Sequence, residues 1–136
     1  MDFLKVINES IQSAIKYQDI WLQNYRNLKT DFEYLKSNNP KLSDIDILIR
    51  MKKERQDNQK LYKDAGKKDL EQNEVVELTI LQNFIPKEPS EVEIIDFLKT
   101  LNIEKSKKNF KQFQEKCENQ FGMKVNSKII LQFIDG

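Results

Sequence analysis

The chain has 136 residues, with 23 basic and 22 acidic side chains, no histidine, one cysteine and three glycines. This length allows one compact domain or two small ones and excludes a multidomain enzyme. The absence of histidine excludes a His-dependent catalytic triad, and the lone Cys117 excludes both an intramolecular disulfide and a zinc site built from several thiolates.

Apolar residues recur mainly at intervals of three and four, and the few Gly and Pro residues leave little room for hairpins. We therefore predict an all-α protein. A first helix is predicted over residues 2–17, and a second helix from about Trp21 to a stop at residues 38–40. The apolar stripe of the second helix consists of Trp21, Tyr25, Leu28, Phe32 and Leu35.

Ser43 stands where an N-cap is expected, with two aspartates in the turn behind it, and it predicts the start of a third helix. This helix should end at Gly66, because glycine adopts the left-handed conformation that closes many helices. Its polar middle, residues 52–60, is expected to project into water. A fourth helix should begin near Asp69, and its wide apolar face predicts the central helix of the core.

Pro86 and Pro89 interrupt the helical pattern, and Ser90 and Glu93 have the Ser-x-x-Glu spacing of a capping box. Three short helices with a small shared core are predicted after this break, and they should lie within residues 92–101, 110–121 and 129–134. The sequence thus predicts an N-terminal helical bundle followed by a smaller three-helix C-terminal domain. The predicted domains are residues 1–86 and residues 87–136.

The nearly neutral chain has an uneven distribution of charge. Residues 50–68 contain eight basic side chains and three acidic ones, a balance of +5, whereas residues 69–93 contain seven acidic side chains and one basic one, a balance of −6. A basic surface of this kind is typical of proteins that contact RNA phosphates, and we expect no DNA binding. The candidate RNA-binding residues are Arg50, Lys52, Lys53, Arg55, Lys63, Lys67 and Lys68.

An alternative interpretation is that these basic residues form an ordinary solvated helix face, because at 100° per residue they scatter around the helix. Glu74 and Glu77 lie three residues apart and share a face, but we expect them to serve the helix N-terminus and local ion pairs rather than to bind a metal. No Gly-rich phosphate loop, Gly-x-Ser-x-Gly motif or Cys-x-x-Cys pair is present. The sequence therefore predicts no catalytic residues, no metal and no cofactor, and at most an accessory to an enzyme.

No uninterrupted apolar run exceeds three residues, whereas a membrane-spanning helix needs about 20. The first residues lack the charged-then-apolar pattern of a signal peptide. We expect a cytoplasmic protein without membrane contact, and an organellar location stays open.

One stretch of the sequence resembles the GatB/YqeY family. The family pattern places an Arg eleven residues before a Gly, followed by basic-x-Asp-Leu, two Glu three apart and an aromatic-Leu-Pro end. Here Phe84-Ile85-Pro86 takes that last place, and the similarity extends upstream through Tyr25-Arg26. The residues that occupy the family motif are Arg26, Arg55, Gly66, Lys67, Asp69, Leu70, Glu74, Glu77 and Pro86.

The resemblance implies a two-part helical fold similar to the tail of the B subunit of tRNA-dependent amidotransferases, which helps to hold tRNA. It also brings the family label of a carbon–nitrogen ligase with glutamine as amido-N-donor. The first functional hypothesis is therefore a non-catalytic accessory domain that binds tRNA or another structured RNA. The alternative is a helical protein-interaction module that docks on a larger complex without RNA contact.

Overall fold

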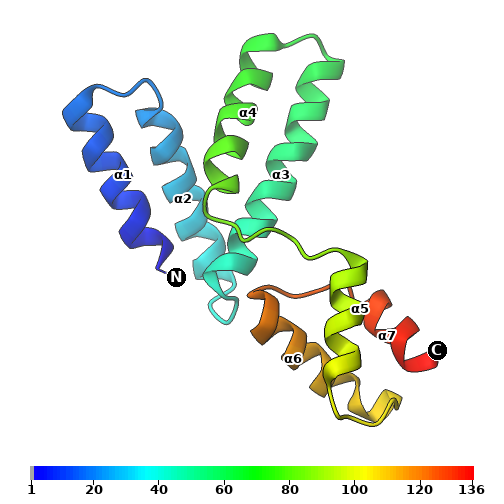
Figure 1. The fold of residues 1–136 in the computed structure, drawn as a ribbon. Coiled ribbons are helices and arrows are strands. Elements are labelled where there is room, and N and C mark those ends of the chain that lie inside the picture. Colours follow the sequence, from blue (N-terminus) through cyan, green and yellow to red (C-terminus); the bar gives the residue numbers. More distant parts are fainter. Residues whose placement is uncertain (1) are drawn as a thin grey trace. The chain divides into compact units, whose positions relative to one another are not determined.

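The computed structural model describes residues 2–136 and is all-α, as predicted (Figure 1). It contains seven α-helices, one short 3₁₀ helix and no strand among these residues. None of its helices has both the length and the apolar character needed to cross a lipid bilayer.

The first two helices form a hairpin. Helix α1, Phe3–Tyr17, begins after Asp2, whose carboxylate accepts a hydrogen bond from the backbone N–H of Lys5 at 3.2 Å. It ends at Gln18, which has a left-handed φ of 53°. Helix α2, Leu22–Asn38, returns alongside α1.

The next two helices form a second hairpin, and its sequence signals are confirmed. Helix α3, Asp44–Asp64, is capped by Ser43, whose hydroxyl accepts from the N–H of Asp46 at 3.2 Å. At its end Gly66 has a φ of 70° and donates to the carbonyl of Lys63 at 3.1 Å, while Lys67 donates to the carbonyl of Tyr62 at 2.9 Å. These two bonds are the Schellman pattern that satisfies the last carbonyls of a helix. Helix α4, Lys68–Gln82, follows at once.

The core of these four helices draws on all of them. Its buried side chains come from the first turns of α1, the middle of α2, the start of α3 and the end of α4. Phe3 lies at the centre, with ring centroids 4.7 Å from Phe32 and 5.3 Å from Phe84. Helix α2 packs against α1, α3 and α4, and α4 packs against α2 and α3, so the central place expected for the fourth helix stays a prediction.

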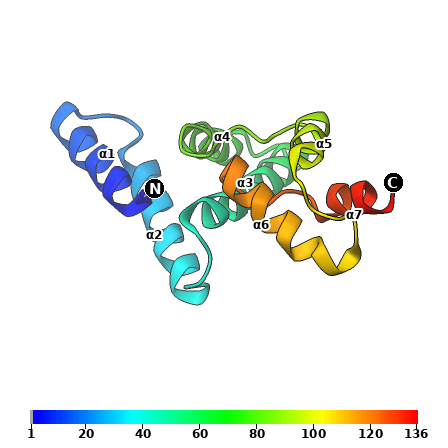
Figure 2. The ribbon, with the colours of Figure 1, turned by 60° about the horizontal axis from the view of Figure 1, so that its bottom comes forward.

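Helices α5, Glu91–Thr100, α6, Phe110–Phe121, and α7, Ser127–Asp135, pack against one another around a second core (Figure 2). The 3₁₀ helix, Lys107–Asn109, leads into α6. Both hydrogen bonds of the predicted capping box between Ser90 and Glu93 are present. Phe113 and Cys117 are fully buried in this core, and burial raises the pKa of the Cys117 thiol. The thiol therefore stays protonated and packs as a small apolar group.

The chain divides into two compact units, the first ending at Ile85 and the second formed by residues 86–136. Helices α1–α4 belong to the first unit and helices α5–α7 to the second. Each unit has a hydrophobic core of its own.

Candidate functional site

Three helices of the first unit bring a buried polar cluster together. Arg55 on α3 is 5% exposed, Glu77 on α4 is 6% exposed and Asn24 on α2 is 8% exposed. The Arg55 guanidinium forms an ion pair with the Asp31 carboxylate and another with Glu77, in which Nη2 and Oε1 are 3.1 Å apart. The second oxygen of Glu77 accepts hydrogen bonds from the side-chain amides of Asn24 at 3.0 Å and Asn27 at 3.2 Å.

These polar residues continue the apolar stripes of their helices by one turn. Arg55 follows the buried Met51 by four positions, Asn24 precedes the buried Leu28 by four, and Glu77 precedes Ile80 by three. Residues three or four apart share a helix face, so each polar side chain points the same way as the core residue next to it. The buried cluster therefore extends the hydrophobic core, with charged and amide side chains in place of apolar ones.

The electrostatics of the cluster keep Arg55 charged. Burial lowers the pKa of Arg55, but the hydrogen bond and charge of Asp31 and the charge and hydrogen bond of Glu77 outweigh burial, so the net pKa is raised. One N–H donor of the guanidinium is unpaired. Within the described residues, Nε of Arg55 is buried and has no hydrogen-bond partner.

The structure corrects two interpretations of the sequence. Arg55 was expected on a solvated helix with the other candidate RNA contacts, but it is buried and its terminal nitrogens are engaged by carboxylates. Glu77 is expected to serve the N-terminus of its helix and local ion pairs; it forms an ion pair, but with Arg55 on α3, and it also accepts a hydrogen bond from Asn24 on α2. Sequence reasoning also missed Asn24, Asn27 and Asp31 as partners of this cluster. The continued stripes are the signal that could have found the buried members.

A groove of about 440 Å³ opens beside the buried cluster, bounded by α2, α3 and α4. Four carboxylates and one guanidinium line it, a formal charge of −3. Two of these carboxylates, Asp31 and Glu77, are paired with Arg55, whereas Glu54 and Glu74 are not. The lining residues are Asn27, Thr30, Asp31, Glu54, Arg55, Asn58, Tyr62, Leu70, Asn73, Glu74 and Glu77.

Glu74 is a carboxylate of this groove whose pKa is raised by its surroundings. Burial raises the pKa of Glu74; the charge of Arg55 lowers it in part, and the neighbouring carboxylates Glu77, Glu54 and Asp31 raise it again. In residues 2–136, no set of three or more acidic or cysteine side chains is arranged to hold a metal ion.

Replacing Glu74 by glutamine is expected to stabilise the protein at neutral pH. Because the pKa of Glu74 is higher in the folded state than its ordinary 4.5, ionised Glu74 opposes folding at neutral pH, and this cost disappears as the pH falls below 4.5. After allowance for solvent screening we expect Tm to rise by about 2 °C at pH 7 and to be unchanged at about pH 4. Thermal unfolding followed by circular dichroism at both pH values tests this. An unchanged or lower Tm at pH 7 would contradict it.

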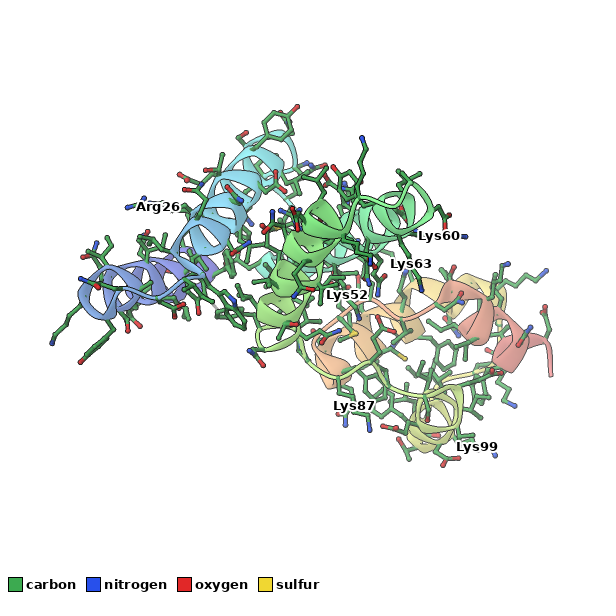
Figure 3. The ribbon with its side chains drawn as sticks, turned by 90° about the horizontal axis from the view of Figure 1, so that it is seen from above. Arg26, Lys52, Lys60, Lys63, Lys87 and Lys99 are labelled. Carbon is green, nitrogen blue, oxygen red and sulfur yellow. The ribbon has the colours of Figure 1, made fainter. Side chains whose placement is uncertain are left out.

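A second feature is the basic tip of the α3–α4 hairpin, which we define as Lys60, Lys63, Lys67 and Lys68. All four side chains are exposed, and none of them forms an ion pair with another described residue. In Figure 3 the side chains of Lys60 and Lys63 leave the last turns of α3 in different directions. No side chain caps the N-terminus of α4, where the first backbone N–H groups lack intrahelical acceptors.

The remaining basic candidates lie apart from the basic tip. Arg50 is exposed and donates to Oδ1 of Asn39 at 3.4 Å, and it lies about 20 Å along α3 from Lys63. Lys53 is exposed and paired with Asp57 at 3.6 Å, while Lys52 is half-buried. The structure thus brings Lys63, Lys67 and Lys68 together but not the other four candidates.

The residues that carry the family motif fall mainly into these two places. Arg55, Leu70, Glu74 and Glu77 line the groove. Gly66, Lys67 and Asp69 form the turn between α3 and α4 and the first turn of α4. Arg26 points outward from α2, away from α3 and α4 (Figure 3), and Pro86 is exposed.

A family model described as Yqey-like protein matches residues 4–129. The chain belongs to this YqeY family. The match includes both the groove and the basic tip, and it confirms the resemblance found from the motif residues. A search of curated proteins gave no match to this YqeY-like chain.

Proposed function

We propose that this YqeY-like chain is a non-catalytic, cytoplasmic accessory domain that binds tRNA or another structured RNA through its basic tip. The observation that carries the proposal is the set of four exposed lysines without ion pairs beside the uncapped N-terminus of α4. Helix N-termini bind phosphate well because their free N–H groups and the helix dipole both favour an anion. The resemblance to the amidotransferase tail supports tRNA as the RNA, and a role as accessory to a glutamine-dependent amidotransferase.

The proposed contact is with the RNA backbone. Lysine ammonium groups and backbone amides recognise phosphates without reading base edges, so affinity should depend on salt and on RNA shape more than on sequence. If all four lysines contact phosphates, affinity should fall by about 50- to 150-fold between about 50 and about 200 mM salt.

Charge reversal at the basic tip tests the proposal. We expect Lys67→Glu with Lys68→Glu to weaken binding of bulk tRNA by at least about tenfold at about 50 mM salt and to flatten the salt dependence. A filter-binding titration measures both quantities. The matched control, Lys111→Glu with Lys116→Glu, makes the same charge change at exposed positions on α6 and should retain most of the affinity. Absence of tRNA binding at low salt, or an equal loss in the control, would exclude the basic tip as an RNA site.

The groove favours a second candidate function, docking on a protein partner. Its formal charge of −3 repels phosphate, so an RNA surface does not explain it. A basic segment of another protein would complement it.

A further inference from the structure

We propose that the groove bounded by α2, α3 and α4 is a docking site for a protein segment that inserts an arginine or lysine side chain. This inference rests on the second candidate function and is independent of RNA contact at the basic tip. It joins three observations: unpaired carboxylates, a buried donor without an acceptor, and mixed apolar and amide walls.

The first observation is the charge that the protein leaves uncompensated. Asp31 and Glu77 form ion pairs with Arg55, whereas no ion pair joins Arg55 to Glu54 or Glu74. Glu74 is half-buried, so its carboxylate has lost part of its hydration without gaining a cation of its own. A guanidinium or ammonium group entering the groove would supply that cation between α3 and α4.

The second observation is Nε of Arg55. This side chain is 95% buried, lines the groove and keeps one N–H without an acceptor. Buried donors in folded proteins are nearly always paired, and an acceptor brought by a bound segment at this wall of the groove would pair this one. A peptide carbonyl fits this need next to four carboxylates, because it accepts a hydrogen bond without adding negative charge. The ligand that offers both a cation and a carbonyl is a polypeptide rather than a simple amine.

The third observation is the composition of the walls. Tyr62 and the partly exposed Leu70 provide apolar surface for the methylene stem of a long basic side chain. Asn27, Asn58 and Asn73 come one from each helix and can donate to or accept from a peptide backbone. A volume of about 440 Å³ lies in the range of ordinary ligand pockets. The groove therefore has room for one basic side chain with its adjoining peptide units.

NMR titration of the full-length, ¹⁵N-labelled chain tests the inference. The probe is the capped peptide acetyl-Ala-Arg-Ala-Leu-amide, and its partner probe carries citrulline, a neutral isostere, in place of arginine. We expect saturable shifts of the Arg55 Nε–H signal and of the side-chain amides of Asn58 and Asn73. The citrulline probe should bind at least about tenfold more weakly, because it lacks the charge that meets Glu54 and Glu74. Spermidine, a free polyamine, should not move the Arg55 Nε–H signal.

Two pairs of variants separate the groove from general electrostatics. Glu54→Gln with Glu74→Gln should weaken the arginine probe at least about tenfold, whereas Glu9→Gln with Glu33→Gln removes two exposed carboxylates elsewhere in the first unit and should leave it unchanged. Equal losses in both pairs, spermidine shifts at Arg55 Nε–H, or failure of the arginine probe to saturate would overturn the inference. So would tRNA displacing the probe from the groove. The variant Lys67→Glu with Lys68→Glu should still bind the arginine probe. The peptide titration therefore tests the groove independently of RNA binding at the basic tip.

Discussion

Arg55→Met is expected to lower the free energy of unfolding of the first unit by about 3–5 kcal/mol, enough to unfold a marginally stable bundle. The substitution removes the cation that neutralises Glu77, which is 6% exposed, and leaves that carboxylate charged inside the protein. Asp31 loses its partner as well. Trp21 is the only tryptophan of the chain and packs against the core of the first unit, so its fluorescence in a urea titration reports this unfolding directly.

A double variant separates the charge from the packing. Arg55→Met with Glu77→Leu removes both charges and should recover a large part of the lost stability, because a buried ion pair can be replaced by apolar side chains of similar size. Arg50→Met on the same helix is exposed and serves as the control, with an expected change within about 0.5 kcal/mol. If Arg55→Met unfolds at the urea concentration of the unmodified protein, the buried cluster does not stabilise the fold.

Phe113→Ala is expected to unfold the second unit. Phe113 is 0% exposed and meets Phe133 edge-on at a centroid distance of 5.8 Å. Truncating a buried Phe costs about 3–5 kcal/mol, which matches the entire stability that a core of this small size usually supplies. Far-UV circular dichroism should lose the helical signal of α5–α7, while the unfolding midpoint reported by Trp21 should stay the same.

This second experiment also tests the division into residues 1–86 and 87–136, which stays a prediction. Gln112→Ala, on the exposed face of α6, is the matched control and should leave both signals unchanged. A shift of the Trp21 midpoint together with the loss of helix would mean that the two units unfold cooperatively, against the predicted division.

The fold could be predicted from the sequence because its signals are local. The cap at Ser43, the stop at Gly66 and the capping box from Ser90 each act within one helical turn, and all three occur as expected. The helical pattern gave the fold class for the same reason, since a period of three to four apolar positions is a property of each segment alone. Which helices pack against one another could not be predicted this way, because that depends on packing between segments far apart in the sequence.

The candidate site was predicted less well. Lys63, Lys67 and Lys68 meet at the basic tip because they are close in sequence, whereas the partners of Arg55 lie 22 and 24 positions away on other helices. A polar residue in an amphipathic helix can continue the buried stripe or face water, and residue type alone favours water for arginine. Only the position of Arg55, four residues after Met51, indicated burial.

The buried cluster has a consequence for how the bundle assembles. Glu77 pairs with Arg55 within the α3–α4 hairpin, whereas its bonds to Asn24 and Asn27, 53 and 50 positions away, join that hairpin to α2. Each hairpin needs little loop closure to form, and the cluster is complete only when α2 of the first hairpin brings Asn24, Asn27 and Asp31 to it. Substitutions of the α2 members of the cluster should therefore accelerate unfolding and leave the rate of folding almost unchanged.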